Sequence, residues 1–476
     1  MKAYSNSQEK KGNMLTDSPG RAMFFFALPM IMGNFFQQFY NIIDSVVVGR
    51  FVGEEALASV GASASITSVF IAVAIGGGVG SSVLVSQFLG AGRLGQMRTA
   101  VSTTLINFLG LSIVLGLAGY GLNDTILRLM HTPDNVFADA ATYLRIYFMG
   151  LPFLFMYNVQ ASIFQSMGDS RTPLYLLIFS SLLNVVLDLW FVLEFHLAVA
   201  GVAWATLIAQ GISALLSFGL LIARVRNMGK DETGALREEE QPRFRFYDGG
   251  MVLRMVKVAL PSTIQQSIVN VGMLLVQSVI NGFGSAVMAG YAAGSRLESL
   301  SIVPMLAAGN AMSTFSAQNM GAGRPDRVRR GYRAGYAIVG GFAVGICLVM
   351  QLWGRQFVLA FMDGGGQSDL ALQTGLQYTK FISFFYVFIG LKAITDGLLR
   401  GAGDMVVFTA ANLVNLTIRV TVAFWLAPVI GPQAVWYAVP MGWLANYLIS
   451  FCRYAGGRWE RIRLVKKEKG AAAGNK

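Results

Sequence analysis

Charged residues are scarce in this chain. Only 13% of its 476 residues are Asp, Glu, Lys or Arg, against about 25% in typical soluble proteins. Hydrophobic residues make up 54% of the chain, and the mean hydropathy is +0.54. A chain with so little polar surface cannot face water on all sides. We therefore predict an integral membrane protein.

Cysteine and histidine are almost absent as well. The two cysteines, Cys347 and Cys452, lie in apolar runs, which indicates neither a disulfide framework nor a thiolate metal site. The two histidines, His131 and His196, lie near expected helix ends. No H-E-x-x-H, cysteine-cluster or serine-elbow motif occurs in the sequence. We therefore expect no enzyme activity, no cofactor and no resident metal.

Long apolar runs are what the sequence has instead. A helix that crosses a bilayer needs about 20 mostly apolar residues. Two runs are too long for one span, and the turn residues Asn281–Ser285 and the prolines of 428–432 divide them. The sequence thus predicts an all-α protein with twelve spans, at 22–48, 54–80, 95–120, 136–165, 172–193, 198–224, 252–281, 286–312, 328–353, 371–399, 405–427 and 433–454.

The basic residues indicate how these spans are oriented. Of the 37 Lys and Arg residues, 29 fall in the two tails and in alternate loops, whereas only Arg50, Arg128 and Arg355 fall in the remaining loops. By the positive-inside rule this bias places both termini in the cytoplasm. The net charge of +12 then marks the face beside anionic lipid and not a nucleic-acid surface. We expect a monomer in the cell membrane.

The two halves of the sequence resemble each other at an offset of about 232 residues. Ala27-Leu28-Pro29 recurs as Ala259-Leu260-Pro261, and Gln87–Arg93 recurs as the similar Gln318–Arg324. The second motif, Gln-x-x-Gly-Ala-Gly-Arg, fits no phosphate-binding fingerprint, and we interpret it as a tight turn at the inner face. Because each half holds six spans, the repeat is parallel, with a substrate cleft between two lobes.

The repeat also defines the domain organisation that we predict. The linker is rich in charged residues, and both tails are polar and contain several basic residues. The segments are a tail at 1–20, an N-lobe at 21–226, a cytoplasmic linker at 227–250, a C-lobe at 251–456 and a basic tail at 457–476.

Polar side chains follow one face of several expected spans. In the first span the spacing of three and four residues places Asn34, Gln37, Asn41 and Asp44 on one helical face. The fifth span carries Ser181, Asn184 and Asp188 in the same way, and the seventh carries Gln266, Asn270, Gln277 and Asn281. An acid at the centre of a spanning helix costs about 2.5–3.5 kcal/mol. Asp44 and Asp188 are therefore functional candidates, with helix packing as the alternative.

Three more charged residues lie inside expected spans of the second half. Lys392 and Asp396 are spaced i, i+4 and can form an ion pair, which we interpret as structural. Arg419 occupies the position that Asp188 has in the first half, and its partner is open.

Together these features resemble the multidrug and toxic compound extrusion (MATE) family of cation antiporters. The resemblance runs from Arg21 to Arg453 and depends on the twelve spans, the paired Leu-Pro and Gln-x-x-Gly-Ala-Gly-Arg motifs, Asp44, and Arg400–Asp404. It implies a V-shaped pair of six-helix bundles that export amphipathic organic cations in exchange for H+ or Na+. It also implies an N-lobe ion site formed by Asp44, Asn184, Asp188 and Thr206.

The resemblance is incomplete in the second half. One branch of the family has acids in the seventh and tenth helices, whereas here those places fall near the apolar Val269 and Ile389. This favours coupling through the N-lobe, with Asp44 and Asp188 as the coupling carboxylates. A flippase for lipid-linked oligosaccharides of the same superfold is the alternative function, although its cavity would gather Arg and Lys for phosphates. A channel and a membrane-embedded enzyme are weaker alternatives.

Overall fold

The computed structural model describes residues 13–228, 244–362, 369–462 and 464–465, and these residues form helices and short turns without any strand. The all-α prediction is confirmed. The helices are α2 (Pro19–Val47), α3 (Glu54–Gly90), α4 (Leu94–Leu129), α5 (Asp134–Ser166), α6 (Arg171–Leu193), α7 (Ala198–Asn227), α8 (Gly249–Asn281), α9 (Ser285–Ser301), α10 (Val303–Gly321), α11 (Pro325–Ala360), α12 (Asp369–Ser383), α13 (Tyr386–Ala402), α14 (Met405–Ile430) and α15 (Gln433–Ala455). A short π-helix, Val48–Val52, follows α2, and a 3-10 turn, Arg458–Arg461, follows α15.

Two of the twelve spans are broken helices, where the sequence predicted continuous ones. The span expected at 286–312 consists of α9 and α10, and Pro304 in the first turn of α10 explains the break because proline lacks a backbone N–H. The span expected at 371–399 consists of α12 and α13, which meet at 52°. The stretch from Tyr378 to Gly403 is about one helical turn longer than residues 147–168, the corresponding stretch of the first half. The bend lies within this longer stretch.

Several helices extend beyond their expected ends, most clearly α3, which continues to Gly90 instead of residue 80. Within the described residues, nine helices are long and apolar enough to cross a membrane, and the bent pair α12–α13 is a tenth candidate. The broken pair α9–α10 and helix α15 complete the twelve spans.

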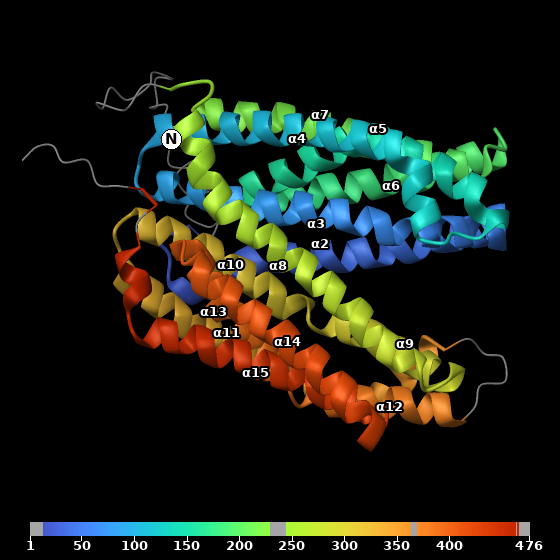
Figure 1. Cartoon of the computed structure of the whole chain (residues 1–476). Coiled ribbons are helices and arrows are strands. Elements are labelled where there is room, and N and C mark those ends of the chain that lie inside the picture. Colours follow the sequence, from blue (N-terminus) through green and yellow to red (C-terminus); the bar gives the residue numbers. More distant parts are fainter. Residues whose placement is uncertain (1–12, 229–243, 363–368, 463, 466–476) are drawn as a thin grey trace, which may run out of the picture.

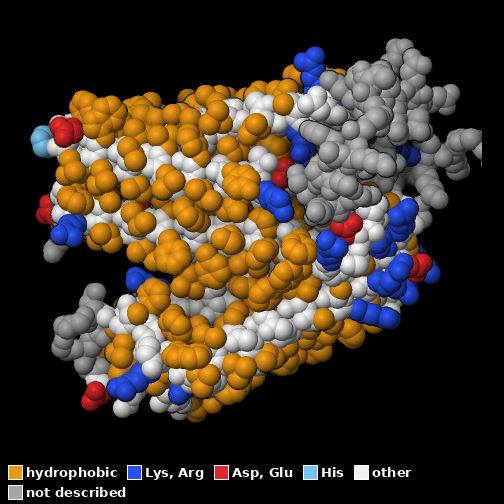
Figure 2. Space-filling view, turned by 180° about the vertical axis from the view of Figure 1, so that it is seen from behind, with side chains coloured by type: hydrophobic (Ala, Val, Ile, Leu, Met, Phe, Trp, Pro, Cys, Tyr) orange, Lys and Arg blue, Asp and Glu red, His pale blue; other side chains and the backbone are white. Residues whose placement is uncertain are grey.

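The helices form two bundles that touch at one end and diverge toward the other (Figure 1). Helices α2 to α7 form the N-lobe and α8 to α15 the C-lobe. In the space-filling view, hydrophobic side chains cover much of the visible face of both bundles, and a cleft separates the bundles at the open end (Figure 2). Lys and Arg gather at the other end, which we call the basic end.

The first helix of each lobe crosses to the other lobe at the basic end. Ala22 and Phe26 of α2 belong to the hydrophobic core of the C-lobe. In the same way, Met251 and Met255 of α8 belong to the core of the N-lobe. This exchange buries apolar side chains of both lobes in a shared interface, and that burial favours the closed basic end.

Glycines allow the two lobes to approach backbone to backbone at this end. A Cβ on Gly80 would lie 2.4 Å from the Ala259 Cα, and one on Gly90 would lie 1.9 Å from the Gln318 carbonyl oxygen. Gly321 meets the Gln87 carbonyl in the same way, at 2.0 Å. Only a residue without a Cβ fits at such a contact.

Each turn motif of the repeat also binds the opposite lobe. The Gln87 side chain donates from Nε2 to the Gly401 carbonyl at 2.9 Å, and Gln318 donates to the Ser166 carbonyl at 2.8 Å. Both amides are buried. The two Gln-x-x-Gly-Ala-Gly-Arg motifs thus contain tight turns, as predicted. They also join the two lobes at the basic end by the same contacts in both directions, and we call this pair of contacts the latch.

The described parts of both tails lie at this end too. Asn319 donates to the Met14 carbonyl at 3.1 Å, and Arg327 donates to the Asp17 carbonyl. Trp459 is fully buried, and Leu464 contacts Gly403. The expected linker at 227–250 and the two expected tails lie partly outside the described residues.

Candidate functional site

A cavity of about 410 Å³ lies inside the N-lobe. Its walls come from α2, α3, α5, α6 and α7, with Asn310 of α10 at the boundary with the C-lobe. The polar stripe of the first span faces this cavity, because Asn34, Gln37, Asn41 and Asp44 all line it. Asp44 is the one charged side chain among the described lining residues.

The two N-lobe acids face each other at this cavity. Asp44 is half-buried on α2, Asp188 is fully buried on α6, and their carboxyl groups lie within hydrogen-bond distance. Neither Oδ1 atom has a hydrogen-bond partner among the described residues. Two carboxylates at such a distance repel each other strongly unless a proton or a cation lies between them. The arrangement can therefore hold one positive charge.

Asn184 and Thr206 complete the group that the resemblance implied. The Tyr40 hydroxyl contacts the Asn184 amide. With its amide nitrogen turned toward Asp188, Asn184 donates to the Asp188 Oδ2 at 3.2 Å and accepts from the Thr206 backbone N–H at 3.1 Å. Helices α2, α6 and α7 thus meet at one cluster of oxygen atoms.

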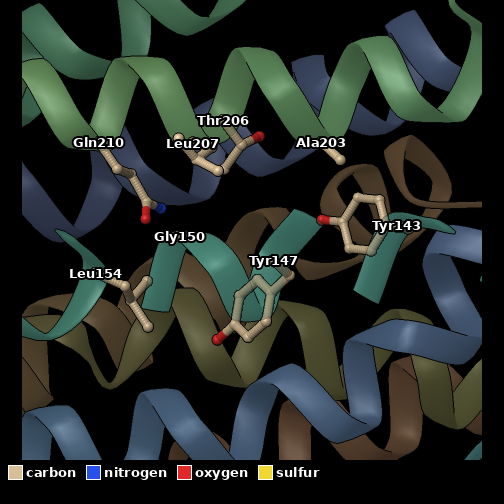
Figure 3. A pocket seen from close by; sticks show the side chains of 8 residues that line it. All are labelled: Tyr143, Tyr147, Gly150, Leu154, Ala203, Thr206, Leu207 and Gln210. Carbon is tan, nitrogen blue, oxygen red and sulfur yellow. The ribbon is translucent and has the colours of Figure 1, made fainter. Parts of the chain in front are cut away.

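The structure adds tyrosines that the sequence analysis missed. Tyr40, Tyr143, Tyr147 and Tyr157 line the cavity. Figure 3 shows a smaller pocket between α5 and α7, and its residues Tyr143, Tyr147, Thr206 and Gln210 also line the cavity. The sequence did contain a signal for these tyrosines, namely helical spacing. Tyr40 falls on the same helix face as Asp44, and Tyr143 and Tyr147 are spaced i, i+4 on another helix. Tyrosine is also common in apolar cores, so this pattern alone does not distinguish the two locations.

The polar residues predicted for the C-lobe lie elsewhere. Lys392 and Asp396 form an ion pair on α13, with 3.0 Å between Nζ and Oδ2. Asp396 also accepts hydrogen bonds from Ser450 at 3.0 Å and Asn412 at 3.2 Å, so its carboxylate is fully bonded. This geometry fits a structural pair that joins α13, α14 and α15.

The remaining C-lobe candidates are not part of the N-lobe cavity either. Gln266 and Asn270 are half-buried on α8 and are not among the described lining residues of the cavity. Arg419 lies midway along α14 and packs against Gly442 of α15.

Comparisons with known proteins identify the family. The MatE family model matches residues 29–190 and again residues 261–425, one match in each lobe. The probable multidrug resistance protein YpnP of Bacillus subtilis is 30% identical over 475 residues, which are 98% of this chain and 100% of that protein. The probable multidrug resistance protein NorM of Thermotoga maritima is 23% identical and covers 93% of this chain and 94% of its own length.

A solved structure has the same fold. It is described as the outward-facing conformation of a multidrug resistance MATE family transporter of the MOP superfamily. It aligns with a TM-score of 0.83 at 22% identity and covers 96% of this chain and 99% of its own. The twelve-span, two-lobe fold is therefore confirmed. The protein is a multi-pass membrane protein that belongs to the MATE family of transporters and is not an enzyme.

Proposed function

We propose that this protein exports amphipathic organic cations in exchange for a proton, and that Asp44 and Asp188 carry that proton. The observation that supports this most directly is the facing pair of carboxyl groups beside a large cavity. Relatives with names such as multidrug resistance protein support the substrate class.

Competition for one negative charge gives the simplest mechanism. A proton between Asp44 and Asp188 relieves the repulsion of the pair and lowers its negative charge from two units to one, so the site then holds a cation less strongly. When the proton leaves, the carboxylate attracts an organic cation from the cytoplasm. The proton and the drug therefore do not bind at the same time, and the proton gradient drives the export of the drug.

The cavity suits a varied set of cations. Its volume of about 410 Å³ lies within the range for drug-sized ligands. Tyr143, Tyr147 and Tyr157 offer aromatic faces that attract cations, while the amides Asn34 and Gln37 bind polar substituents. In Figures 1 and 2 this cavity belongs to the lobe on one side of the open cleft, and we propose that the cleft faces outward. A cation that loses its counter-charge to a proton can leave through that cleft.

Sodium is the alternative coupling ion. Asp44, Asp188 and Thr206 present oxygen atoms, which hard cations prefer, and Asn184 joins them when its amide oxygen and not its nitrogen faces Asp188. We favour the proton, because carboxyl groups within hydrogen-bond distance of each other can share one directly. Ethidium efflux from vesicles under separate pH and sodium gradients distinguishes the two ions.

The decisive test is the Asp44→Asn variant. We expect gradient-driven ethidium efflux from energised vesicles to be abolished, while expression and insertion stay normal. Asp188→Asn is expected to be nearly as severe. Asp124→Asn is the matched control, because Asp124 is half exposed and its ion pair with Arg145, at 2.9 Å, lies on the surface. Gradient-dependent efflux at a near-normal rate by Asp44→Asn would refute the mechanism.

We also propose that the basic end is cytoplasmic, in the cell membrane. A single cysteine at position 240, in a cysteine-free background, should react with a membrane-impermeant reagent only after the cells are opened. Residue 240 lies outside the described residues, so the proposal depends on the charge bias alone. Labelling in intact cells would overturn this topology.

A further inference from the structure

The cavity of the N-lobe extends from the open end toward the latch. Asp44 lines it near the C-terminal end of α2, whereas Gln165 and Ser170 line it where α5 ends and α6 begins. Ser166, between these two residues, accepts the hydrogen bond from Gln318 that forms half of the latch. The latch is therefore the layer of protein that closes the cavity toward the basic end.

Arg400 of α13 lies in this layer. Its neighbour Gly401 accepts the other hydrogen bond of the latch, from Gln87. The Arg400 guanidinium donates from Nη2 to the Asn310 Oδ1 at 2.7 Å and from Nε to the Ser313 Oγ at 3.2 Å. Asn310 in turn lines the cavity. The guanidinium thus lies directly behind a residue of the cavity wall, beside the contact that closes the basic end.

The charge of Arg400 has no ion-pair partner among the described residues. The two acids nearest to it in the sequence already have partners, because Asp396 pairs with Lys392 at 3.0 Å and Asp404 pairs with Arg453 at 2.5 Å. Both of those pairs are neutral as a whole. Arginine does not lose its proton in proteins, so a fixed positive charge remains at the latch.

Only neutral groups stabilise this charge. Arg400 is half-buried, its two hydrogen-bond acceptors are an amide and a hydroxyl oxygen, and the Phe408 ring centroid lies 6.0 Å from its Cζ. An aromatic face and neutral acceptors offset part of the cost of burying a cation. An uncharged side chain of similar length would have no such cost, so the presence of arginine here indicates a use for the charge itself.

We propose that Arg400 is an electrostatic seal that keeps cations from crossing the closed basic end. Asp44 and Asp188 attract cations into the cavity, and this attraction also acts on cations on the far side of the latch. A fixed positive charge in the latch opposes their entry, because like charges repel over several ångströms in a medium of low dielectric constant. Arginine at a constriction excludes cations from pores by the same physics. The inference goes beyond the proposed function, since it concerns the closed end and holds for either coupling ion.

The test measures passive ion leak through the purified full-length protein in liposomes. Symmetric rubidium iodide is used without a proton or sodium gradient, and uptake of radioactive rubidium and radioactive iodide is followed separately. Arg400→Gln should leak rubidium at least about tenfold faster than the wild type, whereas its iodide leak should not rise. Arg400→Lys keeps the charge but loses the guanidinium fork, and its rubidium leak should stay close to the wild-type value.

The comparison of the two ions separates the charge from its structural role. A rubidium leak that is unchanged in a folded Arg400→Gln protein would overturn the proposal. Equal increases for rubidium and iodide, or equal rubidium leaks for the Gln and Lys variants, would overturn it as well, because they would indicate a loosened latch. Arg330→Gln is the matched control, since Arg330 is exposed near the start of α11, and it should leave both leaks unchanged.

A second variant keeps Arg400 in place. Asn310→Asp puts a carboxylate where the Asn310 Oδ1 now accepts from the guanidinium, and it should raise the rubidium leak as Arg400→Gln does. Asn310→Ser shortens this side chain without adding a charge and should leak little. A leak from Asn310→Ser but not from Asn310→Asp contradicts the seal. Because no coupling gradient enters the measurement, its failure is distinct from a failure of the Asp44→Asn export test.

Discussion

The two lobes share one architecture but differ in how they neutralise buried charge. In the N-lobe, Asp44 and Asp188 are like charges that face each other. In the C-lobe the buried Asp396 forms an ion pair with Lys392 of the same helix. A site without an internal counter-charge has to take one from solution, whereas a paired site does not.

The two lobes should be most alike at the contact between them, so equivalent substitutions there should have equal effects. We expect Gly90→Val and Gly321→Val to reduce export by at least about tenfold each, because an added Cβ would overlap a carbonyl oxygen of the opposite lobe. Efflux in vesicles and labelling of the basic end measure the effect. Gly110→Val is the control, since nothing lies within 4 Å of its added Cβ. A severe effect from one glycine and none from the other would show that the latch is not symmetric.

Neutralising a single buried acid should change the stability of the protein differently in the two lobes. Asp396→Asn leaves the Lys392 ammonium unpaired, with a side chain only 14% exposed, and should cost about 3–5 kcal/mol of folding free energy. Asp188→Asn removes a repulsion and should leave the melting temperature unchanged or raised.

The double variant Lys392→Met/Asp396→Asn should lose less stability and less export than the sum of its single variants. Thermal unfolding in detergent and vesicle efflux provide both readouts. Additive losses in both would argue against a coupled pair.

Tyr147 and Tyr378 occupy equivalent positions in the two halves, and replacing them should change the free energy of unfolding by smaller and unequal amounts. Tyr378→Phe removes a hydrogen bond to a carboxylate and should cost about 1.5–3 kcal/mol, whereas Tyr147→Phe removes one to a backbone carbonyl and should cost about 0.5–1.5 kcal/mol. Thermal unfolding of both variants gives the comparison. Equal losses would mean that Glu298 does not strengthen its bond.

The lipid-facing surfaces should be equivalent in the two lobes. Leu117 of α4 is 71% exposed and Leu348 of α11 is 57% exposed. Leu→Met at either position should change stability by less than about 0.5 kcal/mol and leave efflux intact. A clear loss at one position would reveal a contact on that face.

The sequence was sufficient for the fold because the bilayer restricts it so strongly. Apolar runs of spanning length, the breaks at Asn281–Ser285 and 428–432, and the repeat together predicted twelve helices in two lobes. The stripe from Asn34 to Asp44 was predictable for the same reason, since polar groups enter lipid at a cost and so indicate an internal surface.

Periodicity along one helix says nothing about which helix it faces, and that limit explains what the sequence did not predict. The resemblance to the MATE family placed Asp44 and Asp188 in one site, but periodicity alone does not give their approach, which depends on how α2 and α6 pack. Likewise Glu298 and Tyr378 lie on different helices, and only the packing of α9 against α12 brings them into hydrogen-bond contact.

The amino-acid sequence by itself determined that this protein spans a membrane, how many times, and in which two halves, because hydrophobicity and repeats are properties of a linear chain. Only the tertiary structure decided that Gly90 and Gly321 close the basic end, that α2 and α8 cross between the lobes, and that one lobe is left with a pair of facing acids. These features depend on distances between segments remote in sequence, and such distances are set by the packing of whole helices.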